Sequence, residues 1–151
     1  MFELIQSSNP QRRGYLLEKM IKELFDLFDL DPKASFKVLG EQIDGAFTFD
    51  NTDYLLEAKW EKSPLSLEPL YAFSMKVKNK LDNTLGLFIA INGFSAEAIT
   101  KLSGGNCNII LMDGSDLMAV LEQQIKLPEL LLRKRRHAAQ TGNAFLTFRD
   151  F

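Results

Sequence analysis

Three charged residues, Asp44, Glu57 and Lys59, have the chemistry to bind a divalent cation and to act beside it. Twelve residues separate Asp44 from Glu57, and only Ala58 separates Glu57 from Lys59. Carboxylate oxygens are the ligands that hard cations such as Mg²⁺ prefer, so a cation could lie between Asp44 and Glu57. A simpler alternative stays open, in which Asp44 and Lys59 form an exposed cross-strand ion pair worth under about 1 kcal/mol.

A β-hairpin is predicted at residues 40–60, and it would position these three residues. Apolar and polar residues alternate with a period of two on both sides of the turn-forming residues 50–53. Because the side chains of a strand alternate between its faces, Glu57 and Lys59 share a face. Trp60 lies on the other face and is expected to hold the strand from behind.

The register of this hairpin decides which residues meet across it. If Asp50 pairs with Asp53, Asp44 lies opposite Lys59. Asp44 and Glu57 then form a diagonal pair, roughly 7–8 Å apart, on the same face of the sheet.

The order of the remaining elements predicts an α/β fold. Hydrophobic periodicity and turn residues predict an N-terminal helix before the hairpin and strand–helix units after it. This order favours a central mixed β-sheet, an antiparallel hairpin plus a βαβ unit, flanked by helices on both faces. The predicted elements are a helix at 10–30, strands at 35–39, 85–91, 107–112 and 145–148, and helices at 66–81, 95–102, 115–124 and 127–140.

Length and composition indicate one ordinary globular domain. The chain has 151 residues, a formal net charge of −2 and a single cysteine. One cysteine excludes an internal disulfide and a multi-cysteine zinc site, and Cys107 is expected to be buried in a strand. No signal peptide or long apolar span is found, so the expected location is the cytoplasm, without a membrane.

Three motifs give the sequence a resemblance to a known family. They are the Asp-x12-Glu-Ala-Lys spacing from Asp44 to Lys59, the segment from Gly14 to Glu18, and the Leu-Phe-Ile-Ala-Ile-Asn-Gly-Phe-Ser segment at residues 87–95. The chain from residue 11 to residue 121 resembles the PD-(D/E)xK nuclease superfamily, in particular the Mrr-like restriction endonuclease domain. One departure is Ile43, where these nucleases often have proline.

The resemblance implies a restriction-endonuclease-like fold and a metal site. The implied cofactor is Mg²⁺, with Mn²⁺ able to substitute, and Lys59 would position or help to deprotonate the attacking water. The implied metal ligands are Asp44, Glu57, the backbone carbonyl of Ala58, and Glu18 of the first helix. Pattern alone favours another interpretation of Glu18, as a rim charge or as the partner of Lys22.

Basic residues near the C-terminus are candidates for binding nucleic acid. Arg133, Lys134, Arg135 and Arg136 form the strongest basic cluster of the chain. They could contact phosphates, or they could form a solvated helix end that complements the helix dipole. Asn92 and Ser95 could contact a phosphate at a helix start, and His137 could act as a catalytic base. Lys76, Lys78 and Lys80 are expected on the surface of the helix at 66–81.

Three functional hypotheses follow. The first is a metal-dependent nuclease acting on nucleic acid, with DNA expected, of restriction or anti-phage type, as a homodimer or as part of a larger protein. The second is a catalytically inactive nuclease fold that binds nucleic acid or serves assembly, for which the absence of a net positive charge leaves room. The third is an unrelated α/β interaction domain, which would bind no metal.

Overall fold

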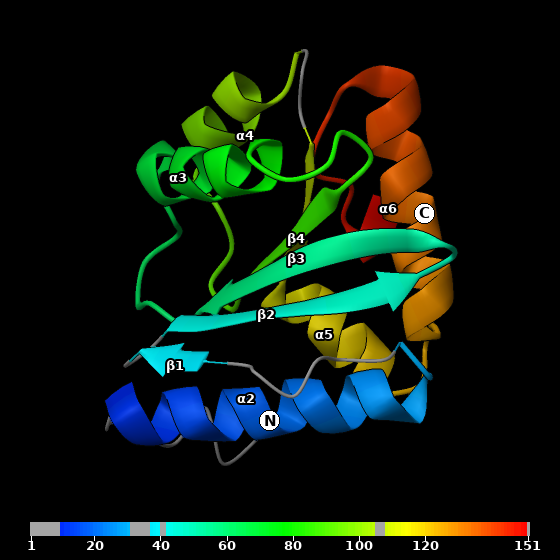
Figure 1. Ribbon diagram of the computed structural model, residues 1–151. Coiled ribbons are helices and arrows are strands. Elements are labelled where there is room, and N and C mark those ends of the chain that lie inside the picture. Colours follow the sequence, from blue (N-terminus) through cyan, green and yellow to red (C-terminus); the bar gives the residue numbers. More distant parts are fainter. Residues whose placement is uncertain (1–9, 31–36, 40–41, 105–107, 151) are drawn as a thin grey trace.

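The computed structural model describes residues 10–30, 37–39, 42–104 and 108–150 (Figure 1). None of the helices in these ranges is long and apolar enough to cross a membrane. In chain order the elements are α2 (Pro10–Leu27), β1 (Lys37–Leu39), β2 (Gln42–Phe49), β3 (Thr52–Lys59), α3 (Leu67–Lys78), β4 (Leu85–Ala90), α4 (Ala96–Leu102), β5 (Ile109–Asp113), α5 (Gly114–Leu121), α6 (Leu127–Thr141) and the 3₁₀ turn η1 (Phe148–Asp150).

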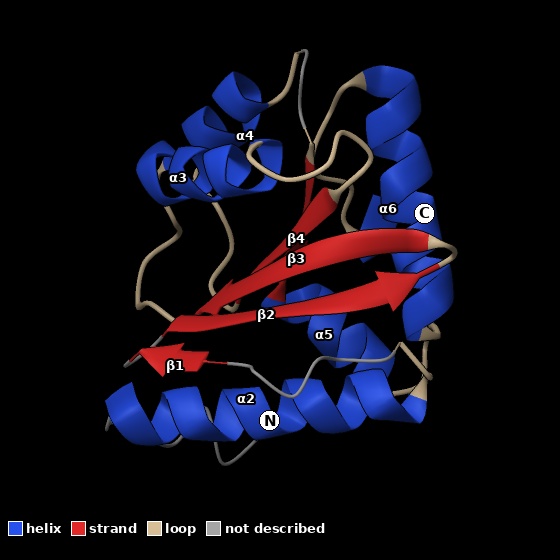
Figure 2. Ribbon diagram, viewed as in Figure 1, coloured by secondary structure: helices blue, strands red, loops and turns tan. Residues whose placement is uncertain are grey.

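One mixed sheet of five strands, in the order β1-β2-β3-β4-β5, organises the molecule (Figure 2). The pairs β1–β2 and β2–β3 are antiparallel, whereas β3–β4 and β4–β5 are parallel. This arrangement confirms the predicted α/β fold with an antiparallel hairpin followed by βαβ units.

Helices cover both faces of the sheet, and two hydrophobic cores result. The core on one face packs α2, α5 and α6 against the sheet, with Phe47, Leu56 and Ile110 among its buried residues. The core on the other face packs α3 and α4, with Phe73, Phe88 and Leu111 among its residues. In Figure 1, α2 and α5 lie below strands β2 and β3, whereas α3 and α4 lie above them. The parallel strands β4 and β5 are buried on both faces, which explains their continuous apolar runs.

The hairpin register differs from the prediction by two residues. Phe49 pairs with Thr52, so the turn contains only Asp50 and Asn51. Both turn residues have positive φ, 51° and 59°, as in the type I′ turns that match the twist of paired strands. The predicted Asp50–Asp53 pairing, and with it the Asp44–Lys59 pairing, was therefore wrong. Asp44 lies opposite Glu57 instead.

The predicted edge strand at residues 145–148 does not form. Its polar groups are used by side chains: Lys134 Nζ donates to the carbonyl of Leu146 at 2.6 Å, and the amide of Phe148 donates to Asp116 Oδ1 at 3.0 Å. One backbone hydrogen bond, from Leu111 N to Ala144 O at 3.2 Å, connects this segment to β5. The segment then ends in η1. Cys107, expected in a buried strand, and residues 35 and 36 of the first predicted strand lie outside the described residues.

Candidate active site

Glu57 is a buried carboxylate in the middle of the sheet. It lies in β3 between Asp44 of β2 and Phe88 of β4, and it is 4% exposed. Its strand neighbours Leu56 and Ala58 belong to the core of α2, so Glu57 faces the layer of α3 and α4. A carboxylate removed from water in this way requires a compensating cation or hydrogen-bond donors.

The observed register makes Asp44 the direct cross-strand partner of Glu57. Directly paired residues lie on the same face of a sheet, with Cβ atoms only roughly 5 Å apart. This pairing is closer than the diagonal arrangement expected from the sequence. The two acidic residues are therefore adjacent in the sheet, as a shared cation would need.

Lys59 lies two residues after Glu57, on the same face and at the carboxyl end of β3. Its side chain is 21% exposed, and its Nζ is 3.8 Å from Glu61 Oε1. In the sheet Lys59 pairs with Ala90, which in turn pairs with Asp113, so the carboxyl ends of the three parallel strands meet here. This partly exposed ammonium group is accessible to a substrate that approaches this edge.

Lys76 of α3 joins the site, although sequence reasoning treated it as a surface residue. Its Nζ donates to Glu57 Oε1 at 3.3 Å. Glu57 and Lys76 come from different elements, and their contact depends on the packing of α3 over β3. The available sequence signal was the spacing of Lys76 and Lys80, which places both lysines on one side of a helix.

Residues behind Glu57 hold the strand from the other face. Ala58 is fully buried between Ile43 of β2 and Ile89 of β4. Trp60 is 7% exposed and belongs to the core of α2, and the guanidinium of Arg13 lies 5.5 Å from its ring centroid. Trp60 thus lies on the face of the sheet opposite Glu57, as the strand alternation predicts.

Glu18 is not brought to this face of the sheet. It lies on α2, which packs on the opposite face from α3, and its carboxylate pairs with Lys22 at 2.8 Å. Its side chain is 16% exposed. The structure therefore places Glu18 in the i,i+4 pair that pattern alone favoured.

The basic cluster of α6 divides into exposed and buried residues. Arg133 is exposed and pairs with Glu129 at 2.8 Å. Arg135 binds Asp50 of the hairpin turn at 2.6 Å, and this hydrogen bond raises the pKa of the guanidinium. Arg136 is exposed. Three of the four residues thus keep some access to solvent.

Lys134 neither contacts phosphate nor forms a solvated helix end, the two alternatives for the basic cluster, because its side chain is buried. It is 1% exposed, and its Nζ lies 2.9 Å from Asp116 Oδ2 and 2.8 Å from the carbonyl oxygen of Leu111. Burial lowers the pKa of Lys134 and raises the pKa of Asp116, and the attraction between the two charges opposes both shifts. Lys134 therefore joins α6 to α5 and β5 and is not available to a phosphate.

Three further candidates have structural contacts. Asn92 Nδ2 donates to the carbonyl of Glu61, and Ser95 Oγ accepts from Ala98 N at 3.1 Å as the N-cap of α4. The carbonyl of His137 accepts from Thr141 Oγ1 at 2.6 Å. Ser95 thus has the capping role that already accounted for it in the sequence.

The acidic residues of the site have the oxygen ligands that a hard divalent cation prefers. Glu57 offers carboxylate oxygens beside a strand partner of the same chemistry, Asp44, and one of these oxygens accepts a hydrogen bond from Lys76. The described side chains contain no group of three or more His, Cys, Asp or Glu that could hold a metal. The side chain of Asp44 lies outside this described part of the structure.

Comparison with known families decides what kind of domain this is. Residues 13–121 match the family Mrr_cat, described as restriction endonuclease. The chain belongs to this restriction endonuclease family. The match confirms the resemblance drawn from Asp44, Glu57 and Lys59, all of which lie within it. A comparison with curated proteins found no match.

A solved structure supports the fold of this restriction endonuclease domain. The structure, "MspJI Restriction Endonuclease in Complex with 27-mer Oligonucleotide", is similar with a TM-score of 0.50 and 17% sequence identity. The similarity covers 91% of this chain and 34% of the MspJI chain. The domain therefore spans about a third of that protein, and the likeness shows the fold.

Proposed function

We propose that this domain is a metal-dependent nuclease that hydrolyses phosphodiester bonds, with DNA as its substrate. The observation that carries the proposal is the strand pairing of Asp44 with the buried Glu57, with Lys59 two residues further on the same face. Acidic residues paired directly across a hairpin repel each other, and a cation shared between Asp44 and Glu57 would relieve that repulsion.

Each of these residues has a role in the proposed reaction. Asp44, Glu57 and the carbonyl of Ala58 would hold Mg²⁺ or Mn²⁺, which when bound neutralises phosphate charge and lowers the pKa of a bound water. Lys59 would hold the attacking water in place and stabilise the charge that develops on the phosphate. Glu18 pairs with Lys22 on α2, so this proposal assigns it no role.

Family and neighbour support a restriction or anti-phage role on DNA. The solved neighbour is a restriction endonuclease with a bound oligonucleotide. Since one site cuts one strand, cutting a duplex needs two sites, which a homodimer or a larger assembly would supply. Arg133 and Arg136 of α6 are exposed residues that could contact phosphates.

The test is cleavage of plasmid DNA with Mg²⁺ or Mn²⁺. We expect wild type to cut, and Asp44→Ala and Lys59→Ala each to reduce the rate by roughly a hundredfold or more, as for the loss of a group that stabilises the transition state. Glu18→Ala, on the other face of the sheet, is the matched acidic control and should retain activity.

The second hypothesis, an inactive nuclease fold, predicts a different result. The ion pair between Lys76 and Glu57 favours it, because a lysine can compensate a carboxylate that no longer binds metal. Calorimetry with Mn²⁺ separates the two. Wild type that neither cuts DNA nor binds Mn²⁺ would refute the nuclease proposal and leave the inactive module.

A further inference from the structure

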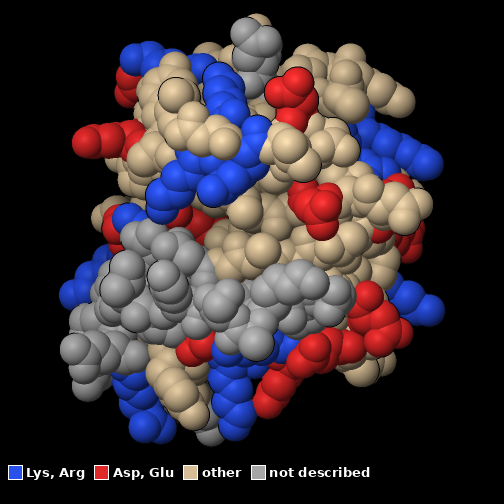
Figure 3. Space-filling view, in the orientation of Figure 1, with Lys and Arg blue, Asp and Glu red and all other residues tan. Residues whose placement is uncertain are grey.

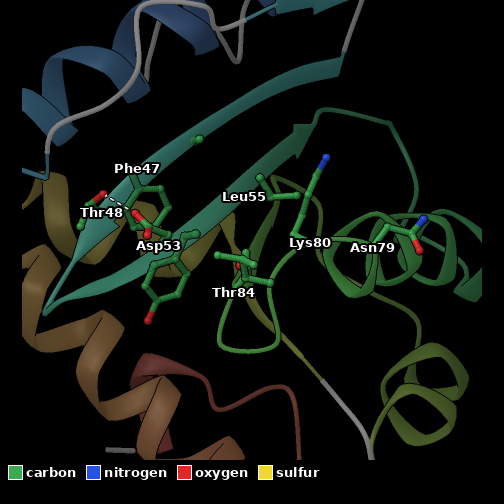
Figure 4. A pocket seen from close by; sticks show the side chains of 10 residues that line it. Phe47, Thr48, Asp53, Leu55, Asn79, Lys80 and Thr84 are labelled. Atoms are coloured by element: carbon green, nitrogen blue, oxygen red, sulfur yellow. Dashed lines mark hydrogen bonds between the residues drawn. The ribbon is translucent and has the colours of Figure 1, made fainter.

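Two adjoining pockets form one groove that leads to Glu57. The first, of about 330 Å³, is lined by Glu57, Phe73 and Lys76 among others. The second, of about 520 Å³, continues along the β2–β3 hairpin to Thr48 and Asp53 (Figure 4). Leu55, Asn79 and Lys80 line both pockets, so the two are continuous. We call this combined hollow the α3 groove.

We propose that the α3 groove binds the backbone of the DNA strand that is cut, with Lys76 and Lys80 contacting its phosphates. This inference deepens the proposed function and rests on it. It assigns substrate binding to α3, whereas the sequence directed attention to the basic cluster of α6.

The two lysines are placed for this role on one side of α3 and the loop after it. They are four residues apart, and each is exposed. The side chain of Lys76 is 54% exposed even though it contacts Glu57. Within the described part of the chain, Lys80 has no ion-pair partner that would neutralise it, and Figure 3 shows basic side chains gathered over α3 in this view.

Lys76 can serve both Glu57 and a phosphate. An ammonium group has three hydrogen-bond donors, and one of them is directed at Glu57 Oε1. A cation bound by Glu57 would compensate its charge in place of Lys76. Without a cation, the other two donors of this half-exposed lysine can still reach a phosphate along the groove.

The floor and the far end of the groove also suit a polynucleotide. Ala46 and Leu55 form part of an apolar floor, on which the sugar and base of a nucleotide can pack. Figure 4 shows Lys80 beside Leu55, with Thr48 and Asp53 away from it. Asp53 is the acidic residue among those that line this pocket, and its Oδ1 accepts a hydrogen bond from Thr48 Oγ1 at 2.8 Å. Its negative charge would repel a phosphate at that end of the groove. The charges along the α3 groove therefore favour binding of the DNA backbone between Lys80 and Glu57.

The experiment measures DNA binding without metal and without cleavage. Fluorescence anisotropy with a short labelled DNA duplex in EDTA compares wild type with the double variant Lys76→Ala/Lys80→Ala. We expect the double variant to bind on the order of tenfold more weakly at low salt, with a salt slope smaller by about 2, because two phosphate contacts are lost.

Lys78→Ala is the matched control. It removes the same charge from the same helix, but Lys78 lines neither pocket. The double variant Lys78→Ala/Lys101→Ala removes the same total charge as the groove variant, from positions on α3 and α4 outside the groove. If it weakens DNA binding equally, the effect depends on net charge alone and the groove assignment is refuted. Far-ultraviolet circular dichroism confirms that the variants are folded.

The outcome separates this inference from the proposed function. Cleavage lost in Asp44→Ala with unchanged DNA binding in the groove variant would refute the α3 groove and keep the nuclease. Binding lost in the groove variant of a protein that never cuts would keep the groove and refute the nuclease. Wild type that binds no DNA would refute both.

Discussion

At the scale of single residues, Lys134 shows how a charge can belong to the interior. Its ammonium group is enclosed by Asp116, the carbonyls of Leu111 and Leu146, and the ring of Phe145 at 4.8 Å. These contacts join α6, α5, β5 and the C-terminal segment at one atom. Removing either charge alone would leave the other buried without compensation.

We therefore expect Lys134→Ala to lower the free energy of unfolding by about 3–5 kcal/mol. Urea denaturation followed by circular dichroism measures the change. Arg133→Ala is the control, since an exposed i,i+4 pair with Glu129 contributes about 0.3–0.5 kcal/mol. Equal stabilities for the two variants would contradict the buried role of Lys134.

At the scale of elements, the β2–β3 hairpin determines which acidic residues meet. The turn of Asp50 and Asn51 fixes the register of the hairpin, in which Asp44 and Glu57 form the sixth residue pair counted from the turn. Arg135 of α6 holds this turn through Asp50 and lies 5.8 Å from the ring centroid of Phe49. A change in the turn is thus transmitted to the candidate metal site through the register.

Asn51→Val tests this connection. Asn51 has φ of 59°, a conformation that a β-branched residue adopts only with strain of about 1–3 kcal/mol. We expect Asn51→Val to lower the free energy of unfolding by that amount and to slow plasmid cleavage, although Asn51 is remote from Glu57 along the strands.

Asn51→Gly serves as the control because glycine accepts a positive φ without strain. This variant should retain wild-type stability and cleavage. Equal behaviour of the valine and glycine variants in urea denaturation would show that the turn does not control the hairpin.

At the scale of the whole molecule, the candidate site lies where the sheet meets the layer of α3 and α4. β3 contributes Glu57 and Lys59, β2 contributes Asp44, and α3 contributes Lys76. Asp44 and Glu57 are brought together only in the folded chain, so a cation that binds both carboxylates would stabilise the native state over the unfolded one.

Saturating Mn²⁺ should therefore raise the thermal midpoint of unfolding. At a concentration a hundred times the dissociation constant the gain is about 2.7 kcal/mol, or several degrees for a domain of this size. Scanning calorimetry of wild type and Asp44→Ala measures it, with Glu18→Ala as the acidic control. A shift that persists in Asp44→Ala would place the cation elsewhere.

The sequence by itself determined the element order as far as α6, the mixed sheet and the shared face of Glu57 and Lys59. These features depend on hydrophobic periodicity and turn residues, which act over short stretches of chain. The strand alternation that puts Trp60 behind Glu57 needs no knowledge of the rest of the molecule. The family resemblance was likewise visible in three short motifs, one of which is the spacing of Asp44, Glu57 and Lys59.

Only the tertiary structure decided the hairpin register, the ion pair of Lys76 with Glu57, and the burial of Lys134. Residues 50–53 allow a two-residue turn at Asp50 and Asn51 or one at Asn51 and Thr52, so local chemistry left the register open. The partners of Lys76 and Lys134 are 19 and 18 residues away in the sequence, as the residue numbers of Glu57 and Asp116 show. Their contacts arise from helices packing on the sheet, and no local pattern encodes which side of a helix meets which strand.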